Sequence, residues 1–275
     1  MANDIKLAMP HVFTNGIRLA YERSGKGERV LLVMGTAASG RAWTLYQTPA
    51  LVQAGYQAVT FDNRGIPPSD VPAGKYSLAD MVEDTKGLIE ALDAAPCRII
   101  GVSLGAMIAQ ELAIRWPHLV RCAVLMATKS RSDAARLAHS RAHQAVIASG
   151  MNMPAEYEAT QMAFQMLSPA SLNDDKAIGL WLETFELAMG SRSTSHGQLW
   201  ADIHQDQRER LRGVTAPCRV IAFSDDLVTP PHLGAEVAEA IPDCDFIEIG
   251  PCGHFGYLER PEEVNSAIIE FLTKN

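Results

Sequence analysis

The sequence lacks an excess of basic residues, and this absence narrows the class of partner. Its 275 residues contain 24 lysines and arginines against 32 aspartates and glutamates, so the formal net charge at pH 7 is −8. A nucleic-acid-binding protein needs a basic face for the phosphate backbone, and no run of Lys or Arg supplies one. The composition therefore disfavours nucleic acid and favours a small, neutral or weakly charged ligand.

Long hydrophobic runs are also missing. No apolar stretch approaches the ~20 residues of a membrane-spanning helix, and residues 1–6 lack the basic and then apolar pattern of a secretion signal. We therefore expect a cytoplasmic protein without membrane contacts. Hydrophobic residues still make up 47% of the chain, which is enough for a substantial buried core.

The five cysteines form neither an even set nor a metal-binding pattern. We therefore expect no disulfide framework, no metal and no other cofactor, and the glycine-rich turn at 101–105 lacks the form of a nucleotide site. Four cysteines stand at or near the start of apolar runs and are interpreted as reduced, buried side chains: Cys97, Cys122, Cys218 and Cys244. Cys252, two residues before His254, either tunes that histidine or serves packing, and packing is favoured.

Short apolar runs alternate with helical periodicity along most of the chain. Asn15-Gly16 between two alternating runs predicts a β-hairpin over residues 9–23. Six further strands are predicted at 30–34, 58–61, 97–102, 120–126, 218–223 and 245–249, and the clearest helices at 77–92, 105–116, 232–240 and 261–272. This order is typical of an α/β fold, with a mostly parallel eight-stranded sheet, helices on both faces and an antiparallel N-terminal hairpin.

Residues 132–213 break the alternation, because they show amphipathic helical patterns but no convincing strand. About eighty residues are too many for a loop in a compact domain. We therefore predict a helical cap at 132–213, inserted after the sixth strand, and a core domain formed by residues 1–131 and 214–275.

The pentapeptide Gly101-Val102-Ser103-Leu104-Gly105 joins the predicted strand 97–102 to the helix that follows it. Strand, Gly-x-Ser-x-Gly and helix in this order form a nucleophile elbow, a turn so tight that only glycines fit two residues either side of the serine. The turn lifts the serine hydroxyl out of the sheet. Ser103 is therefore the candidate nucleophile.

A serine hydroxyl becomes nucleophilic only when a base accepts its proton and a third group orients that base. Ligands bind at the carboxyl ends of parallel strands, so both partners are sought where strands end. Asp225 and Asp226 follow strand 218–223, and His254 follows the last strand on a glycine-rich loop. The other histidines considered are assigned to packed or solvated positions, although one from the insertion could contact a ligand: His118, His139, His143, His196 and His204.

Together these motifs resemble the α/β-hydrolase family over almost the whole chain. The matching segments are residues 61–65, 101–105, 226–231 and 253–255. The chain order Ser, Asp, His is also the order of that family.

The resemblance implies a role for each residue of the triad. Ser103 is the implied nucleophile, His254 the general base and then general acid, and Asp226 the residue that orients the imidazole. Asp226 is favoured over Asp225 because the family's acid usually stands four residues before a proline, here Pro230. Asp133 is a further candidate, since some relatives place the acid after the sixth strand.

The resemblance also implies an oxyanion hole formed by the backbone N–H groups of Leu104 and Thr36. The loop at Thr36 reads Met34-Gly35-Thr36, where the family usually has His-Gly-x. The missing histidine removes a support of that loop. Met-Gly at this place is similar to a subgroup that includes aclacinomycin methylesterase, an enzyme that acts on polyketides.

Methionines and aromatic residues in the insertion predict an apolar roof over Ser103 and a bulky hydrophobic substrate. The predicted pocket residues are Met34, Met126, Trp181 and Phe185, with core packing as the alternative for each. Few basic residues lie near the motifs, which favours a neutral ester over a charged one.

We therefore predict a serine hydrolase that cleaves a carboxylic ester of a small to medium hydrophobic, polyketide-like compound and acts as a monomer or homodimer. One alternative keeps the fold but uses the triad for cofactor-free lyase, cyclase or perhydrolase-type chemistry. Another is a receptor or signalling module that binds a small ligand and a protein partner.

Overall fold

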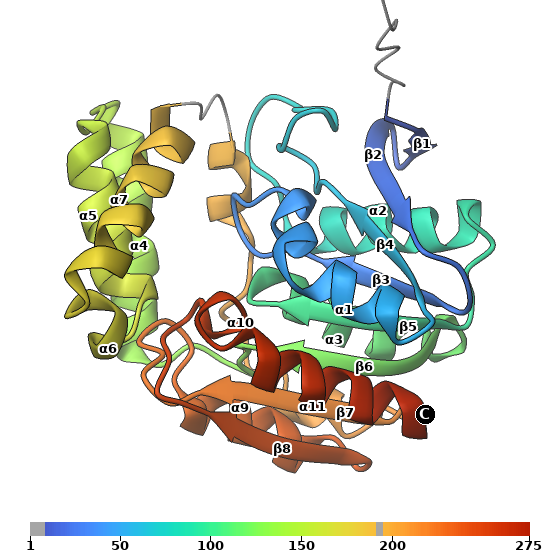
Figure 1. Ribbon diagram of the computed structural model, residues 1–275. Coiled ribbons are helices and arrows are strands. Elements are labelled where there is room, and N and C mark those ends of the chain that lie inside the picture. Colours follow the sequence, from blue (N-terminus) through green and yellow to red (C-terminus); the bar gives the residue numbers. More distant parts are fainter. Residues whose placement is uncertain (1–8, 191–194) are drawn as a thin grey trace, which may run out of the picture.

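The computed structural model describes residues 9–190 and 195–275, and an eight-stranded sheet runs through its centre (Figure 1). The strands lie in the order β1-β2-β4-β3-β5-β6-β7-β8. β1 pairs antiparallel with β2, and β2 with β4, whereas all other neighbours are parallel. Their bounds are β1 His11–Thr14, β2 Ile17–Ser24, β3 Arg29–Val33, β4 Gln57–Phe61, β5 Cys97–Val102, β6 Val120–Met126, β7 Cys218–Phe223 and β8 Cys244–Ile249. The predicted mixed sheet with an N-terminal hairpin is confirmed.

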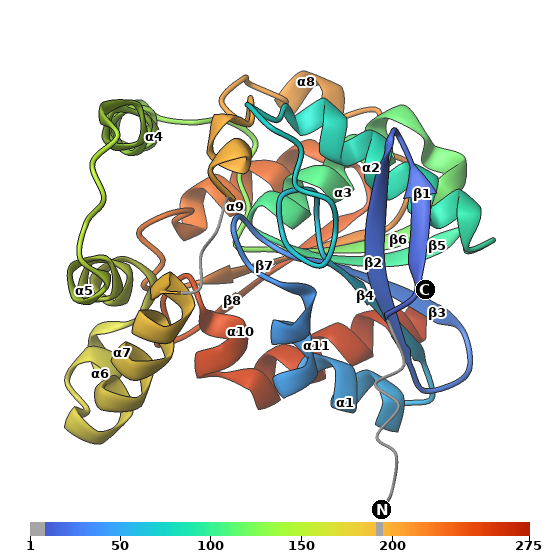
Figure 2. The same ribbon diagram turned by 90° about the horizontal axis from the view of Figure 1, so that it is seen from above.

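Helices cover both faces of the sheet (Figure 2). One face packs against α2 (Leu78–Ala91), α3 (Leu104–Arg115), α8 (Arg208–Leu211) and α9 (Pro231–Ala240). The other packs against η1 (Gly40–Leu45), α1 (Gln47–Gln53), α10 (Gly256–Glu259) and α11 (Pro261–Lys274), and η2 (Pro117–Leu119) links α3 to β6. Successive residues of a strand pack into opposite cores. In β3, Leu31 and Val33 belong to one core, and Val30 and Leu32 belong to the other.

Local sequence signals account for two of the helix starts. Ser77 caps α2, because its hydroxyl accepts a hydrogen bond from the Asp80 N–H while the Asp80 carboxylate accepts one from the Ser77 N–H. Pro261 occupies the first turn of α11, where its missing N–H has no helical partner to lose. Within the described residues, none of the helices combines the length and hydropathy needed to cross a membrane.

All five cysteines are free thiols, and four of them are buried. Burial raises the pKa of Cys97 and of Cys252 to about 12, so both thiols stay protonated and unreactive. Cys244 differs from the prediction because it is partly exposed. It begins β8, the last strand in the sheet order, which has a neighbouring strand on one side alone.

Between β6 and β7 the chain forms α4 (Ala134–Ser149), α5 (Ala155–Met166), α6 (Pro169–Leu172), α7 (Asp175–Gly190), η3 (Ser195–Trp200) and α8. α5 and α7 pack together around a small apolar cluster of Ala159, Ala163, Leu167 and Phe185. None of the 16 residues of α4 is buried, and this helix stands away from the sheet (Figures 1 and 2). The end of the segment behaves differently, because Ala201 and Leu211 belong to the main core of the sheet.

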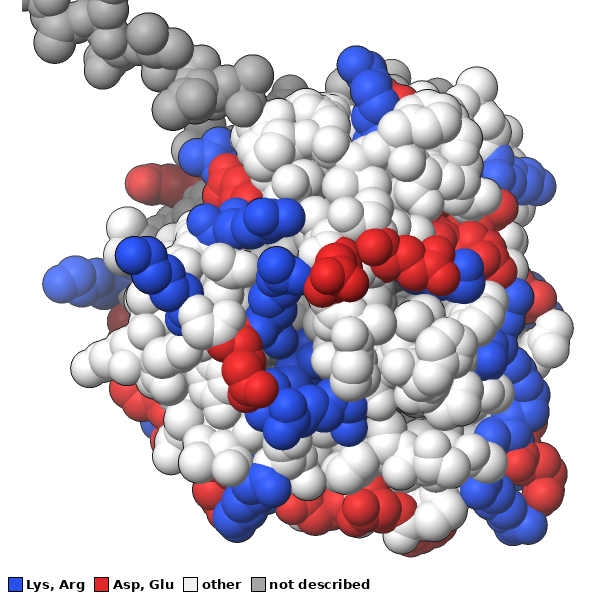
Figure 3. Space-filling view, turned by 90° about the vertical axis from the view of Figure 1, so that its right-hand side faces the viewer, with Lys and Arg blue, Asp and Glu red and all other residues white. Residues whose placement is uncertain are grey.

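The face opposite α4 to α7 carries basic and acidic side chains in alternation (Figure 3). Elsewhere acidic and basic side chains also pair, as the Glu28 carboxylate does with Arg98 at 2.8 Å and with Arg121 at 3.1 Å. Such interspersed charges give this face no broad field of one sign.

Candidate active site

Ser103 lies on a strained turn between β5 and α3. Its backbone has φ 54° and ψ −119°, a conformation that non-glycine residues rarely adopt. A Cβ on Gly101 would lie 2.4 Å from the Gly105 carbonyl oxygen, and one on Gly105 would lie 2.0 Å from the Val33 carbonyl oxygen. Ser103 is partly exposed, whereas its neighbours on both sides are buried. The glycines thus allow the close backbone approach that lifts Ser103 toward solvent.

Asp226 and His254 form a buried pair at the ends of β7 and β8. The Nδ1 atom of His254 lies 2.7 Å from Oδ2 of Asp226, and both side chains are at most 5% exposed. The other oxygen, Oδ1, accepts hydrogen bonds from the N–H groups of Val228 and Thr229 at 2.7 and 2.8 Å. The Thr229 hydroxyl donates to Oδ2 at 2.8 Å. The carboxylate is therefore fully hydrogen-bonded and fixes one ring nitrogen of His254.

These contacts also set the ionisation of Asp226. Burial alone would raise its pKa, but the attraction of His254 and the hydrogen bonds from His254 and Thr229 outweigh burial and lower the pKa below its ordinary value. Asp226 therefore stays a carboxylate at neutral pH, and it protonates only when the pH falls through this lowered pKa.

The other two candidate acids lie elsewhere. Asp133 caps α4, where it accepts a hydrogen bond from the Arg136 N–H and pairs with the Arg136 guanidinium at 2.8 Å. Asp225 is partly exposed, and its backbone N–H donates to the Cys252 carbonyl. Among the described carboxylates, Asp226 is the one in contact with His254.

The N–H groups of Thr36 and Leu104 have no hydrogen-bond partner within residues 9–190 and 195–275. Leu104 is the first residue of α3, where N–H groups lack a helical acceptor. Gly35 brings the Thr36 loop against the elbow, since a Cβ on Gly35 would lie 3.2 Å from Ser103 Cβ. Two unpaired donors thus flank the serine, an arrangement that suits a developing oxyanion.

The structure brings Ser103 and His254 to the same edge of the sheet without joining them by a hydrogen bond in the described part of the chain. Nucleophile and base are often further apart in a free enzyme than in its substrate complex. The elbow, the buried acid–histidine pair and the two donors are all present at one edge.

The description "Alpha/beta hydrolase family" belongs to a family model that matches residues 30–267. This chain belongs to the α/β-hydrolase family. It is 43% identical to the "Putative non-heme bromoperoxidase BpoC" of Mycobacterium tuberculosis over 256 residues, which cover 93% of this chain and 97% of the relative. The crystal structure of BpoC has a TM-score of 0.89, with 42% identity, 93% of this chain and 96% of that chain covered.

Two further relatives have other names. The "Putative carbamate hydrolase RutD" of Pantoea ananatis is 27% identical, over 92% of this chain and 91% of the relative. The "3-oxoadipate enol-lactonase 2" of Acinetobacter baylyi is 26% identical, with 92% of each chain covered. The names span three activities on one fold, so the family alone does not fix the substrate.

In this α/β-hydrolase the insertion holds the loop at Thr36, which carries a predicted oxyanion donor. Gln198 is 2% exposed, and its Oε1 accepts a hydrogen bond from the Ala37 N–H at 2.7 Å while its Nε2 donates to the Arg64 carbonyl at 2.7 Å. Asn63 adds a donation to the Met34 carbonyl at 3.1 Å. These hydrogen bonds hold the loop at residues 34–37, which in the family is usually supported by a histidine that this chain lacks. The sequence gives no local signal for Gln198, because its partner Ala37 is 161 residues away.

The insertion also fixes the loop that carries His254. A Cβ on Gly253 would lie 2.6 Å from the Met166 carbonyl oxygen, so glycine is required where the loop passes beneath the end of α5. Glu259 accepts hydrogen bonds from the Gly253 N–H at 2.6 Å and from the Ser168 hydroxyl at 2.7 Å. Phe255 donates its N–H to the Met166 carbonyl. Residues 253–255 are therefore held between the sheet and the insertion.

A cavity of about 360 Å³ lies between the rim of the sheet, α4 and the segment after η3. Thr36 and Val228 are among the residues that line it, and Ser103 and His254 are not. The remaining lining residues are Lys129, Ala135, Arg136, His139, Ser140, His143, Gln165, Gln198, Leu199, Ile203, His204 and Leu227. The cavity thus reaches the candidate site at Thr36.

None of the four predicted pocket residues lines this cavity. Met34 and Met126 are fully buried in the core beneath the sheet. Trp181 and Phe185 lie in the cluster between α5 and α7, with ring centroids 6.4 and 6.0 Å from that of Phe255. They pack helices together, which is the alternative reading of apolar side chains in an insertion.

Although few basic residues lie near the motifs in the sequence, Lys129 and Arg136 both line the cavity. Lys129 follows β6 by three residues and so stands at the same carboxyl edge as Ser103. The strand-end rule that pointed to Asp225, Asp226 and His254 applies equally to Lys129. Three of the histidines predicted to be packed or solvated also line the cavity: His139, His143 and His204.

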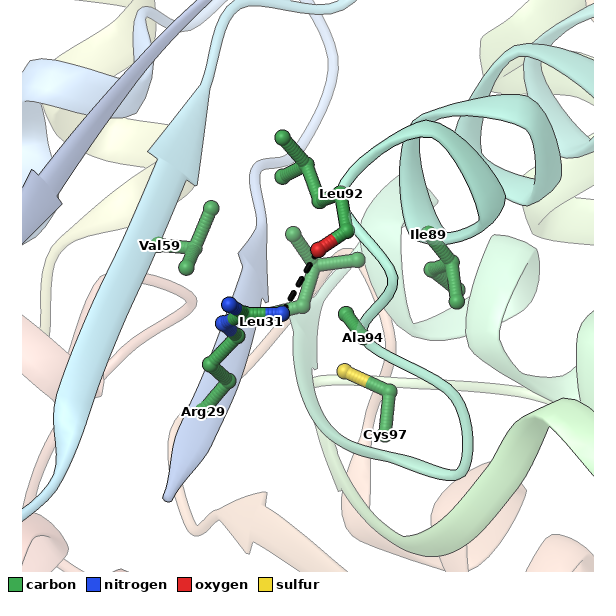
Figure 4. A pocket seen from close by; sticks show the side chains of 7 residues that line it. All are labelled: Arg29, Leu31, Val59, Ile89, Leu92, Ala94 and Cys97. Atoms are coloured by element: carbon green, nitrogen blue, oxygen red, sulfur yellow. Dashed lines mark hydrogen bonds between the residues drawn. The ribbon is translucent and has the colours of Figure 1, made fainter. Parts of the chain in front are cut away.

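A second, much smaller cavity lies at the opposite ends of the strands (Figure 4). Arg29 and Cys97, which begin β3 and β5, lie beside it, and Arg29 donates to the Leu92 carbonyl at 2.6 Å. Its volume of about 10 Å³ is no larger than a water molecule requires. This cavity has no room for a substrate.

A Gln198→Ala variant tests the support of the oxyanion loop. We expect kcat for an ester substrate to fall roughly 10- to 100-fold with little change in KM, because a displaced N–H weakens transition-state binding alone. Steady-state kinetics measures both constants. Gln205→Ala is the matched control, since Gln205 is exposed and bonds to Asp202 in the same segment. Equal kcat values for the two variants would contradict a positioning role for Gln198.

Proposed function

We propose that this protein is a serine hydrolase that cleaves a carboxylic ester through an acyl-enzyme on Ser103. The observation that carries the proposal is the buried Asp226–His254 pair at the same edge as a strained, partly exposed serine. The names of two relatives, a carbamate hydrolase and an enol-lactonase, support attack on an acyl carbonyl. Ester, lactone and carbamate share that first step.

In the proposed acylation, Ser103 Oγ attacks the carbonyl carbon while Nε2 of His254 accepts the hydroxyl proton. Asp226 holds the proton of Nδ1 and stabilises the imidazolium as it forms. The carbonyl oxygen becomes an oxyanion and accepts hydrogen bonds from the N–H groups of Thr36 and Leu104. His254 then gives its proton to the leaving alcohol, and the acyl-enzyme remains.

Deacylation repeats these steps with water. His254 takes a proton from the water molecule while the water oxygen attacks the acyl carbon. The same two N–H groups donate hydrogen bonds to the second oxyanion. The proton returns to Ser103 Oγ as the ester bond to the enzyme breaks. Each proton therefore moves through one ring nitrogen, while Asp226 stays ionised.

We further propose that residues 132–213 act as a cap over this site, with residues 1–131 and 214–275 as the catalytic core. The bonds of Gln198 to Ala37 and of Ser168 to Glu259 support this division of roles. A cap of this kind both shapes the substrate cavity and orients catalytic loops.

Labelling with a fluorophosphonate tests the nucleophile directly. We expect mass analysis to find one phosphonyl group on Ser103, because the reagent requires a serine activated by a base. Hydrolysis of p-nitrophenyl esters should then be abolished by the same label. The Ser103→Ala variant serves as the control and should take up no reagent. Folded protein that stays unlabelled would refute the proposal.

The name of the Mycobacterium relative supports a second candidate, perhydrolase-type chemistry. Hydrogen peroxide would replace water in deacylation and leave with the acyl group as a peracid, returning the proton to Ser103. Peracid formed from p-nitrophenyl acetate oxidises bromide, so bromination of a phenol dye measures this route. Bromination that exceeds the enzyme-free rate and disappears in Ser103→Ala would support it, whereas a rate equal to the enzyme-free rate would exclude it.

A further inference from the structure

Lys129 places a buried cation beside the candidate site. The residue is 6% exposed, lines the cavity of about 360 Å³ and donates from Nζ to the Ser132 hydroxyl at 2.7 Å. Gln110 on α3 donates to its backbone carbonyl at 3.4 Å, which ties it to the helix that begins at the elbow. The backbone of Lys129 is therefore held by the elbow's own helix, and the ammonium is held by Ser132.

This cation has no ion-pair partner among the described residues. The nearest carboxylate named in its electrostatics, Asp133, is already paired with Arg136 at 2.8 Å. Asp and Glu are also absent from the residues that line the cavity. A buried charge is normally compensated by an opposite charge. The cavity beside Lys129 is open to a ligand that carries such a charge.

The remaining lining groups leave one net positive charge. The Arg136 guanidinium is neutralised by Asp133 and also donates to the Leu227 carbonyl at 2.6 Å. Partial burial lowers the pKa of His139, His143 and His204, so these rings are neutral at pH 7. One uncompensated charge matches one carboxylate better than a phosphate dianion.

The chain places this charge close to the nucleophile. The Ser103 N–H donates to the Met126 carbonyl at 3.0 Å, and Lys129 follows Met126 by three residues. Three residues span at most ~11 Å. Thr36, the proposed oxyanion donor, and Lys129 line the same cavity. A single small molecule is therefore long enough to contact both.

We propose that Lys129 binds a free carboxylate of the substrate, so that the natural substrate is an ester or lactone that carries a second, ionised carboxyl group. This inference rests on the proposed hydrolase function and replaces the expected neutral hydrophobic substrate with an anionic one. The substrate carboxylate supplies the charge opposite to Lys129, while the scissile carbonyl lies at Thr36 and Ser103.

Matched esters test the preference. We expect monomethyl succinate, glutarate or adipate to be hydrolysed with a kcat/KM higher than that of methyl butyrate, pentanoate or hexanoate, respectively. In Lys129→Met the preferred diacid monoester should lose on the order of 10- to 100-fold in kcat/KM, mostly through KM. The neutral esters should change less than twofold or so, because they never used the charge. Lys129→Arg should restore part of the preference.

A binding measurement keeps the inference separate from catalysis. Calorimetry with glutarate and with dimethyl glutarate on Ser103→Ala should detect binding of the dianion alone, and this binding should be lost in Ser103→Ala/Lys129→Met. Lys176→Met is the control, since Lys176 is exposed on α7 and does not line the cavity. Equal affinity for glutarate and dimethyl glutarate would overturn the inference even if the protein hydrolyses esters. Glutarate binding without ester hydrolysis would support the site and refute the hydrolase.

The pH dependence supplies a second readout. Burial lowers the pKa of Lys129 to about 8, opposed by Asp133 and assisted by Arg136. His204, which contacts Ser132, also faces this group. As the pH rises through 8 the ammonium loses its proton, so KM for the monoesters should increase relative to KM for neutral esters. A constant ratio of the two KM values from pH 6.5 to 9 would contradict the inference.

Discussion

An Asp226→Asn variant should lose about 10⁴-fold in kcat on a p-nitrophenyl ester. The asparagine amide donates to Nδ1 of His254, which forces the ring proton onto Nε2. That nitrogen then cannot accept the proton of Ser103. The backbone bonds from Val228 and Thr229 to Oδ1 remain available, so the loop keeps its shape. Steady-state kinetics measures the loss, and the melting temperature reports whether the fold is retained.

Asp225→Asn is the matched control for this change. The two aspartates are adjacent, but Asp225 is partly exposed and Asp226 alone of the pair contacts His254 in the described structure. We expect Asp225→Asn to retain kcat within about twofold. If the larger loss fell on Asp225, the assignment of the triad acid would be wrong.

A Gly105→Ala variant should lose more than ~4 kcal/mol of unfolding free energy. Its Cβ would lie 2.0 Å from the Val33 carbonyl oxygen and 2.9 Å from that of Met34, and both belong to backbone that cannot rotate away. Either α3 moves away from β3 or the elbow opens. Urea unfolding followed by circular dichroism measures the change, and a variant that does not accumulate as folded protein meets the same expectation.

Gly179→Ala separates steric conflict from the general effect of adding a methyl group to a helix. Gly179 lies in α7, and nothing lies within 4 Å of a Cβ added there. We expect alanine to stabilise the protein by roughly 0.5–1 kcal/mol, since glycine is the poorer helix former. Comparable destabilisation at both positions would contradict the close approach at the elbow.

The fold was predictable because its signals are local. Period-two and continuous apolar runs marked β1 to β8, and Ser77 and Pro261 marked two helix starts within a residue. The positions of His254 and of the adjacent Asp225 and Asp226 followed from one rule, that parallel strands end at a common edge. Each of these inferences needs only residues that are near in sequence or a general property of sheets. The choice of Asp226 over Asp225 needed the resemblance to the α/β-hydrolase family as well.

The cavity could not be predicted in the same way. Its walls join Thr36, the start of α4 and the segment after η3, which meet through tertiary packing alone. Apolar residues such as Phe185 look the same in sequence whether they line a pocket or hold two helices together. Lys129 also follows the end of a strand, but a lysine is neither the acid nor the base that a serine nucleophile requires.

The unequal attachment of the insertion has a consequence for how the protein can diversify. α4 has no buried residue, so its sequence can drift with little loss of stability, and with it the polarity of the cavity wall changes. Gln198 has no such freedom, because it is tied to Ala37 and Arg64. An exchange of α4 between relatives would therefore transfer the substrate preference and keep the catalytic rate. Removal of the whole insertion would abolish the preference and lower the rate.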